Sequence, residues 1–202
     1  LQPIENRLIR RIGVARHVSI LDAQQKLGDV RAQLSGHLRV VHEHLQPVEV
    51  VRTLNRLFER IVPVVHLHGG HVDKYAGDGL FAVFGAARRH RDHADRALAA
   101  AIQIADVVDD EFGGALSVGV GLNSGPVVAG NVGGAGRLEY SVIGDAVNVA
   151  ARVEAATRLT GDAVLLSEHT LAMLSAPHCR FAERPAMSLK GKALPVQLYA
   201  PR

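Results

Sequence analysis

The sequence predicts an α/β (α+β) fold in which helices pack on a sheet that contains several hairpins. Strand-like and helical runs alternate along most of the 202 residues, and glycine-rich turns separate neighbouring strand-like runs. Hydrophobic residues make up 48% of the chain but aromatic residues only 4%, so the core must be aliphatic. A chain of this length fits one domain, with room for a short appendage.

The N-terminal part divides into three predicted segments. Residues 1–16 are basic and lack a clear period, which indicates a linker or the end of an upstream helix, so that the domain itself covers residues 17–202. Residues 18–21 (VSIL) are a short strand candidate. From position 23 to 44 apolar residues recur at helical spacing, at positions 27, 30, 34, 38 and 41.

A long helix and a hairpin are predicted next. Residues 47–68 have an apolar helical stripe, with Pro47 suited to a first turn and Pro63 expected to kink or break the helix. Two glycines at 69–70 then end the helix, and the period changes. The runs HVDKY and LFAVFG are two strands joined by AGDG, whose glycines suit a tight turn.

The second half continues the alternation of helices and strands. We expect a helix at 93–108, a strand in LSVGVGLNSG, strand or loop edges in VVAGNVG and EYSVIGD, a helix at 146–156, a strand at 163–167, a short helix at 168–174 and two strands around a KGK turn. The run GNVGGAG matches neither a dinucleotide fingerprint nor a P-loop, so a flexible hairpin loop is expected there.

Composition excludes some classes of function. The formal charge of +3 is small and evenly spread, which argues against nucleic acid as a partner. The single cysteine, Cys179, excludes an internal disulfide framework and indicates a reducing, cytoplasmic setting. No run is long enough for a membrane span. Because the chain begins with Leu1, we expect it to be part of a longer protein, whose upstream segments could be sensors or membrane anchors.

One motif places a lysine and an aspartate around a glycine-flanked turn. In GGHVDKYAGDGLFAVFG, Lys74 and Asp78 are four residues apart. The Asp78 carboxylate could hold Mg²⁺ or Mn²⁺ at a strand end, or could simply be a residue that favours turns. Lys74 follows Val72 by two positions on the incoming strand, so both are expected to face the same side. An isolated strand lysine could also be only solvated.

A second motif places two polar residues on a helix that is otherwise small and apolar. Asn148 and Arg152 in SVIGDAVNVAAR are one turn apart and share a face. Together they could reach a ribose and a phosphate, because arginine suits phosphate charge. The alternative is an exposed face with a capping asparagine. The eleven histidines show no paired metal-ligand spacing.

These motifs resemble the catalytic domain of class III adenylyl cyclases, particularly the bacterial members. The matching stretches run in family order from about position 47 to 201: TLNRLFERIV, HGGHVDKYAGDGLFAVFG, DHADRALAAAI, VGVGLNSGPVVAGNVG, YSVIGDAVNVAARVEAAT, LLSEHT and LKGKALPV. The resemblance implies a ferredoxin-like core, an antiparallel-rich sheet with helices packed on it, that dimerises head to tail. It also implies conversion of ATP to 3′,5′-cyclic AMP and pyrophosphate with two divalent metal ions, Mg²⁺ or Mn²⁺.

The resemblance assigns roles to individual residues. Asp78 looks like one of two metal-binding aspartates, and Lys74 looks like the lysine that reads the purine. Guanylyl cyclases have an acidic residue at the lysine position, so Lys74 favours ATP. Ser141 takes the second purine-reading position, where many relatives have aspartate or threonine.

The remaining assignments concern the ribose and the phosphates. Asn148 and Arg152 match the pair that orients the ribose and stabilises the transition state, and Lys190 or Lys192 looks like a contact to the terminal phosphates. In this family Lys74 and Asp78 serve opposite sites, one from each subunit, so the active form is expected to be a homodimer.

The sequence departs from the family at the first metal aspartate. The strand-like VSIL is not followed by the family's pattern L-F-x-D-x-x-G-F-T, and residues 22–46 are atypical. Asp22, at the strand end, is favoured as the substitute, and Asp29 is the alternative; both could instead be surface or capping residues. The main hypothesis is an adenylyl cyclase domain. The alternatives are a catalytically impaired, cyclase-like nucleotide-binding or regulatory module and, opposed by Lys74, a guanylyl cyclase.

Overall fold

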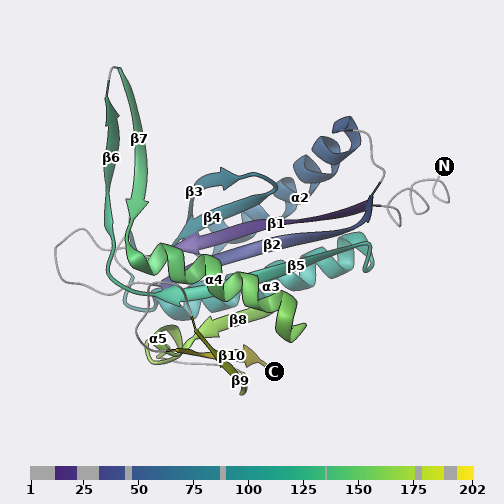
Figure 1. The fold of residues 1–202 in the computed structure, drawn as a ribbon. Helices are drawn as coiled ribbons and strands as arrows, with labels where there is room; N and C mark the ends of the chain where they lie inside the picture. Colours follow the sequence, from purple (N-terminus) through teal and green to yellow (C-terminus); the bar gives the residue numbers. More distant parts are fainter. Residues whose placement is uncertain are drawn as a thin grey trace.

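The computed structural model describes residues 12–21, 32–43, 47–86, 90–134, 136–175, 179–188 and 195–202. One eight-stranded sheet has the order β3-β4-β1-β2-β5-β8-β10-β9, and β6 and β7 form a separate hairpin (Figure 1). The strands are β1 (Ile12–Leu21), β2 (Ala32–Glu43), β3 (His71–Ala76), β4 (Gly79–Val83), β5 (Leu116–Ser124), β6 (Val128–Gly134), β7 (Arg137–Ile143), β8 (Val164–Ser167), β9 (Phe181–Met187) and β10 (Val196–Pro201). The helices are α2 (Pro47–Leu67), α3 (His93–Phe112), α4 (Asp145–Thr160) and α5 (Glu168–Leu171).

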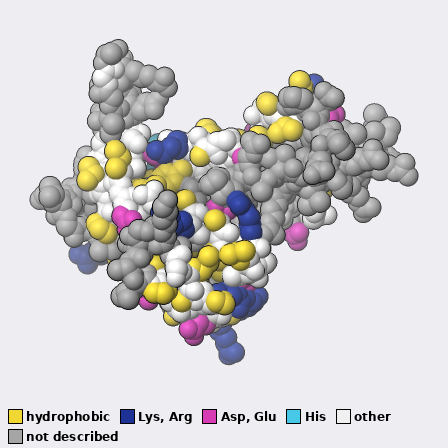
Figure 2. Space-filling view, viewed as in Figure 1, with side chains coloured by type: hydrophobic (Ala, Val, Ile, Leu, Met, Phe, Trp, Pro, Cys, Tyr) yellow, Lys and Arg dark blue, Asp and Glu magenta, His cyan; other side chains and the backbone are white. Residues whose placement is uncertain are grey.

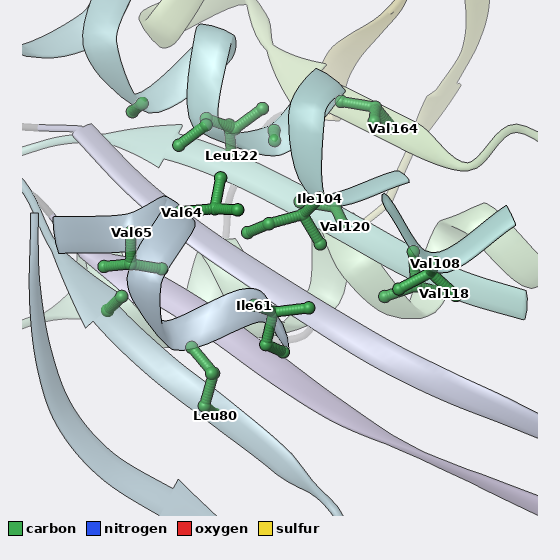
Figure 3. Close-up of a cluster of buried hydrophobic side chains, with 14 of the residues drawn as sticks. Ile61, Val64, Val65, Leu80, Ile104, Val108, Val118, Val120, Leu122 and Val164 are labelled. Atoms are coloured by element: carbon green, nitrogen blue, oxygen red, sulfur yellow. The ribbon is translucent and has the colours of Figure 1, made fainter. Parts of the chain in front are cut away.

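Helices α2 and α3 cover one face of the sheet and bury the main core. Alternate residues of β5 point into this core, as the period of a strand requires. Figure 3 shows how side chains of the two helices meet those of the strands, among them Ile61, Val64, Val65, Leu80, Ile104, Val108, Val118, Val120, Leu122 and Val164. The aliphatic core predicted from composition is therefore confirmed.

Helix α4 packs on the opposite face, and a glycine sets how closely it approaches. A Cβ atom added to Gly121 of β5 would lie 2.2 Å from the backbone nitrogen of Glu154 in α4. No side chain fits in that space, so glycine allows the helix to rest directly on the strand. On the same face, Val149 and Val153 of α4 pack against a second, smaller core.

The β6–β7 hairpin forms an arm that projects away from the sheet (Figure 1). Its strands pair in an unbroken antiparallel register from Val128↔Ile143 to Gly134↔Arg137. The segment GNVGGAG, for which we expected a hairpin loop, therefore belongs mainly to the outer part of this ladder.

Two sequence predictions near the N-terminus need correction. β1 begins at Ile12, so residues 12–16, expected in a linker, belong to the sheet. The helix predicted over 23–44 is wrong from Ala32 to Glu43, because β2 occupies these residues and pairs with β1 and with β5. Backbone hydrogen bonds to two neighbouring strands outweigh a helical spacing of apolar residues. Residues 22–31 lie outside the described part of the chain.

Most of the other predicted elements are confirmed with small changes at their ends. The predicted KGK turn lies outside the described residues, and the strand before it, β9, lies earlier than expected and ends at Met187. The long helix spans α2 with Pro63 inside it, and the hairpin HVDKY/LFAVFG is β3 and β4. The helix predicted at 146–156 is longer and runs until Gly161, whose φ of 77° is left-handed and ends α4. In the described residues, no helix is long and apolar enough to cross a membrane.

Candidate functional site

A small hydrophobic cluster joins β7 and α4, which carry predicted site residues, to β4, the pairing partner of β3. This arm-base cluster consists of Phe81, Val83, Val127, Val142 and Ala146. It ties β4 to the base of the arm and to the first turn of α4. Because β3 pairs with β4, the predicted site residues on β3, β7 and α4 are therefore held in one region of the molecule.

A β-bulge in β3 determines the direction of Lys74. In the pairing with β4, Val72 is opposite Ala82 and Lys74 is opposite Phe81, which leaves Asp73 as the extra residue. Val72 packs against the main core, whereas the Lys74 ammonium lies 5.7 Å from the Phe81 ring centroid. The expectation that Val72 and Lys74 face the same side is therefore wrong, because the bulge reverses the alternation between them.

The bulge brings Lys74 to two polar partners. Its Nζ donates to the Ser141 hydroxyl of β7 over 3.3 Å and lies 3.0 Å from Oδ2 of Asp73. The Lys74 side chain is 48% exposed, whereas that of Asp73 is only 1% exposed. Two residues predicted from separate motifs thus meet, and they present one donor group and one hydroxyl that can donate or accept.

A tyrosine completes the surroundings of this pair. Burial and the negative charge of Asp73 together raise the pKa of Tyr140, which precedes Ser141 in β7. The ring of Tyr140 also meets that of His71 edge to face, with centroids 6.4 Å apart. The base of the arm is therefore fixed to β3 by several side chains.

Asp78 lies in the turn between β3 and β4. The chain reverses at residues 77 and 78, where Gly77 has a left-handed φ of 64°. Asp78 is only 2% exposed. A carboxylate at such a position provides the oxygen ligands that Mg²⁺ and Mn²⁺ prefer.

The second predicted metal ligand, Asp22 or the alternative Asp29, lies outside the described residues. Within the described part of the chain, no three His, Cys, Asp or Glu residues are grouped so that they could hold a metal ion. β1 runs parallel to β4 with Ile20 opposite Ala82, so the end of β1 lies at the far end of β4 from the turn. Ala82 is four residues from Asp78, about 13 Å in a strand.

Asn148 and Arg152 lie one turn apart on α4, whose opposite side is buried against the sheet. Asn148 is exposed and Arg152 is partly exposed. The Nη1 atom of Arg152 is buried, and it has no hydrogen-bond partner among the residues that the structure describes. Because such a donor is costly to leave unsatisfied, it could pair with an anionic ligand.

A buried polar network that sequence reasoning missed fixes the start of α4. The Asn123 side chain donates to the Ala146 carbonyl over 3.0 Å and accepts from the Ser167 hydroxyl at 2.7 Å. Ser124 and Thr170 extend the network through their hydroxyls, which are 3.1 Å apart. The sequence signal was an asparagine and two serines inside otherwise apolar strands, where polar groups need partners.

An open cavity of about 210 Å³ lies beside this network, and Asn123, Asp145 and His169 are among the residues that line it. Its described lining includes none of the predicted site residues. Lys190 and Lys192 lie outside the described residues, so the predicted contact to the terminal phosphates stays a prediction.

Comparison with known proteins identifies the family. The family model "Adenylate and Guanylate cyclase catalytic domain" matches residues 32–200. The uncharacterized protein Rv1320c of Mycobacterium tuberculosis is 42% identical over 154 residues, which are 76% of this chain and 27% of that protein. The chain thus spans about a quarter of the length of such curated relatives.

Solved structures give the same result for the fold. The guanylyl cyclase Cya2 aligns with a TM-score of 0.72 and 28% identity, over 94% of this chain and 93% of that chain. The adenylyl cyclase CyaB from P. aeruginosa aligns with a TM-score of 0.74 over 94% of this chain and 96% of that chain, and at 21% identity shows the fold alone. The mixed α+β architecture is that of class III cyclases, and the chain belongs to the adenylate and guanylate cyclase catalytic domain family.

Proposed function

We propose that this domain converts ATP to 3′,5′-cyclic AMP and pyrophosphate, at sites that two copies of the chain form together. The observation that carries the choice of nucleotide is the contact between Lys74 and Ser141, at 3.3 Å. It joins the two positions that, by resemblance, read the purine in this family of cyclases.

The chemistry of these side chains favours adenine over guanine. Lysine has only donors, which suits the acceptor N1 of adenine. At the corresponding edge guanine presents N1–H and an amino group, which require an acceptor such as a carboxylate. The Ser141 hydroxyl can accept from the amino group of adenine, since its single proton can rotate elsewhere.

Asn148 and Arg152 act on the sugar and the phosphates. The exposed amide of Asn148 orients the ribose so that its 3′-hydroxyl faces the α-phosphorus. The Arg152 guanidinium stabilises the negative charge that develops there. Its buried Nη1 donor, which has no hydrogen-bond partner among the described residues, supports this role. Lys190 or Lys192 binds the terminal phosphates.

Two divalent ions, Mg²⁺ or Mn²⁺, fit this proposal through the buried carboxylate of Asp78. The other carboxylate comes from Asp22 or Asp29, both of which lie outside the described residues. When bound, such ions lower the pKa of the attacking hydroxyl and neutralise the leaving pyrophosphate.

Exposed hydrophobic side chains support a homodimer. On the arm and α4, Val128 is 73% exposed, Ile143 56% and Leu159 78%. Figure 2 shows hydrophobic side chains (yellow) on the surface around the base of the arm. Val128 and Ile143 pair directly across the base of the arm, and adjoining exposed apolar side chains are typical of a surface that a second subunit covers.

A change of purine preference tests the proposed function. Wild-type protein with Mn²⁺ should form cyclic AMP from ATP in preference to cyclic GMP from GTP. Lys74→Glu combined with Ser141→Cys should favour GTP, because an acceptor replaces the donor; each hydrogen bond to a charged group is worth roughly tenfold. The measurement is kcat/KM for both nucleotides.

The control is Asp110→Asn, an exposed substitution on α3 that should leave the preference unchanged. An unaltered ATP preference in the double variant would contradict the purine assignment. No turnover by the wild type with ATP still bound would favour the impaired, nucleotide-binding module.

A further inference from the structure

The β-bulge in β3 places two neighbouring charged residues on the same side of the sheet. In a regular strand, successive side chains point to opposite faces. Here the extra residue is Asp73, and its Oδ2 lies 3.0 Å from Nζ of Lys74. Without the bulge, the alternation would turn Lys74 to the side of Val72, which packs against the main core below α2 and α3.

The two charges differ strongly in exposure. The Asp73 side chain is 1% exposed and that of Lys74 is 48% exposed. A buried carboxylate cannot follow a mobile partner, so it acts as a fixed anchor, whereas the lysine stem is long and flexible. Burial of the charge without a cation would be costly, and the nearby ammonium offsets part of that cost.

The anchor acts together with two other contacts of the ammonium. Ser141 accepts from Nζ at 3.3 Å, and the Phe81 ring centroid lies 5.7 Å away. Burial is the larger cause of the raised pKa of Tyr140, and the negative charge of Asp73 raises it further. The Asp73 carboxylate therefore interacts electrostatically with β7 as well as with Lys74. The ammonium therefore has contacts with Asp73, Ser141 and Phe81 in this structure.

We infer that Asp73 is a positioning residue for the purine site, which holds the Lys74 ammonium at Ser141 before the nucleotide binds. This inference rests on the proposed function for the role of Lys74 as a purine reader. Asp73 itself does not touch the base; it lowers the cost of ordering a long side chain on binding.

A double-mutant cycle tests whether Asp73 acts through Lys74. Asp73→Asn keeps the shape but removes the charge, and should lower the ATP-to-GTP ratio of kcat/KM roughly three- to tenfold. The loss should come mainly from a higher KM for ATP, since the base is remote from the α-phosphorus. In a Lys74→Met background the same substitution should change the ratio less than about twofold.

Asp73→Glu keeps the charge and should retain part of the ATP-to-GTP ratio of kcat/KM that Asp73→Asn loses. Asp110→Asn is the matched control and should leave this ratio unchanged. Equal losses with ATP and GTP in both backgrounds, together with a lower melting temperature, would show a structural role only and would overturn the inference.

A second measurement does not depend on turnover. The chain has four lysines, so ¹³C-lysine labelling gives few signals. In the nucleotide-free protein, NMR relaxation should show a well-ordered Lys74 side chain that becomes mobile in Asp73→Asn but not in Asp110→Asn. Unchanged order in Asp73→Asn would overturn the inference even if the proposed function holds. A loss of order would support it even if neither nucleotide is turned over.

Discussion

Arg152→Ala should lower kcat roughly a hundredfold or more while the domain stays folded. The Arg152 guanidinium interacts with negative charge that develops only in the transition state. Its removal should therefore lower kcat more than it weakens nucleotide binding. Stability should change little, because the buried Nη1 atom of Arg152 donates to no described residue and its removal breaks no hydrogen bond of that atom with them. The measurement is kcat with ATP, beside a thermal melt of the same protein.

Arg96→Ala is a matched control for loss of an arginine. Arg96 pairs with Asp92 one turn earlier at the start of α3, at 2.8 Å, and both are well exposed. Such pairs contribute less than about 1 kcal/mol to stability. Normal kcat in Arg152→Ala would remove that residue from the catalytic machinery.

Asp78→Asn should abolish turnover by a different route, through the metal requirement. The amide keeps the shape of the turn but is neutral, so affinity for divalent ions falls. We expect a loss of roughly a hundredfold or more at low Mn²⁺, partly recovered as Mn²⁺ is raised. Initial rates over a Mn²⁺ titration measure this. An unshifted Mn²⁺ dependence would mean that Asp78 is not a ligand, and Asp110→Asn serves as the control for a lost carboxylate.

The β3–β4 hairpin, which carries Lys74 and Asp78, shows which features can and cannot be predicted from local sequence. Gly77 and Asp78 have strong turn chemistry, so the position of the Asp78 turn followed directly from the sequence. The bulge at Asp73 could not be predicted in this way, because the alternation rule assumes that each residue of a strand is opposite one residue of its partner. The direction of Lys74 therefore required the pairing with β4, which is a tertiary property.

The same contrast applies to the helices and to the N-terminal strands. The apolar stripe of α2 and the small residues of α4 have a single clear period, and both helices were predicted. β2 was not, because its apolar spacing also fits a helix and only the partners β1 and β5 decide the structure. The network of Asn123 was missed because its partners are remote in sequence: Ala146 lies 23 residues further along the chain and Ser167 44 residues.

The two inactive variants should complement each other if two chains build each site together. If Arg152 and Asp78 serve opposite sites of a dimer, a heterodimer of Arg152→Ala and Asp78→Asn has one site with both substitutions and one intact site. Random pairing of equal amounts makes about half of the dimers mixed, and each mixed dimer has one intact site out of two. Activity should therefore return to roughly a quarter of the wild-type value.

The most direct measurement is therefore cyclic AMP formation from ATP with Mn²⁺ by the two variants, each alone and coexpressed. We expect almost no activity from either variant alone and about a quarter of the wild-type rate from the mixture, with activity that rises faster than linearly with protein concentration. A mixture as inactive as its components, with mixed dimers verified by differently tagged chains, would contradict a site shared between subunits.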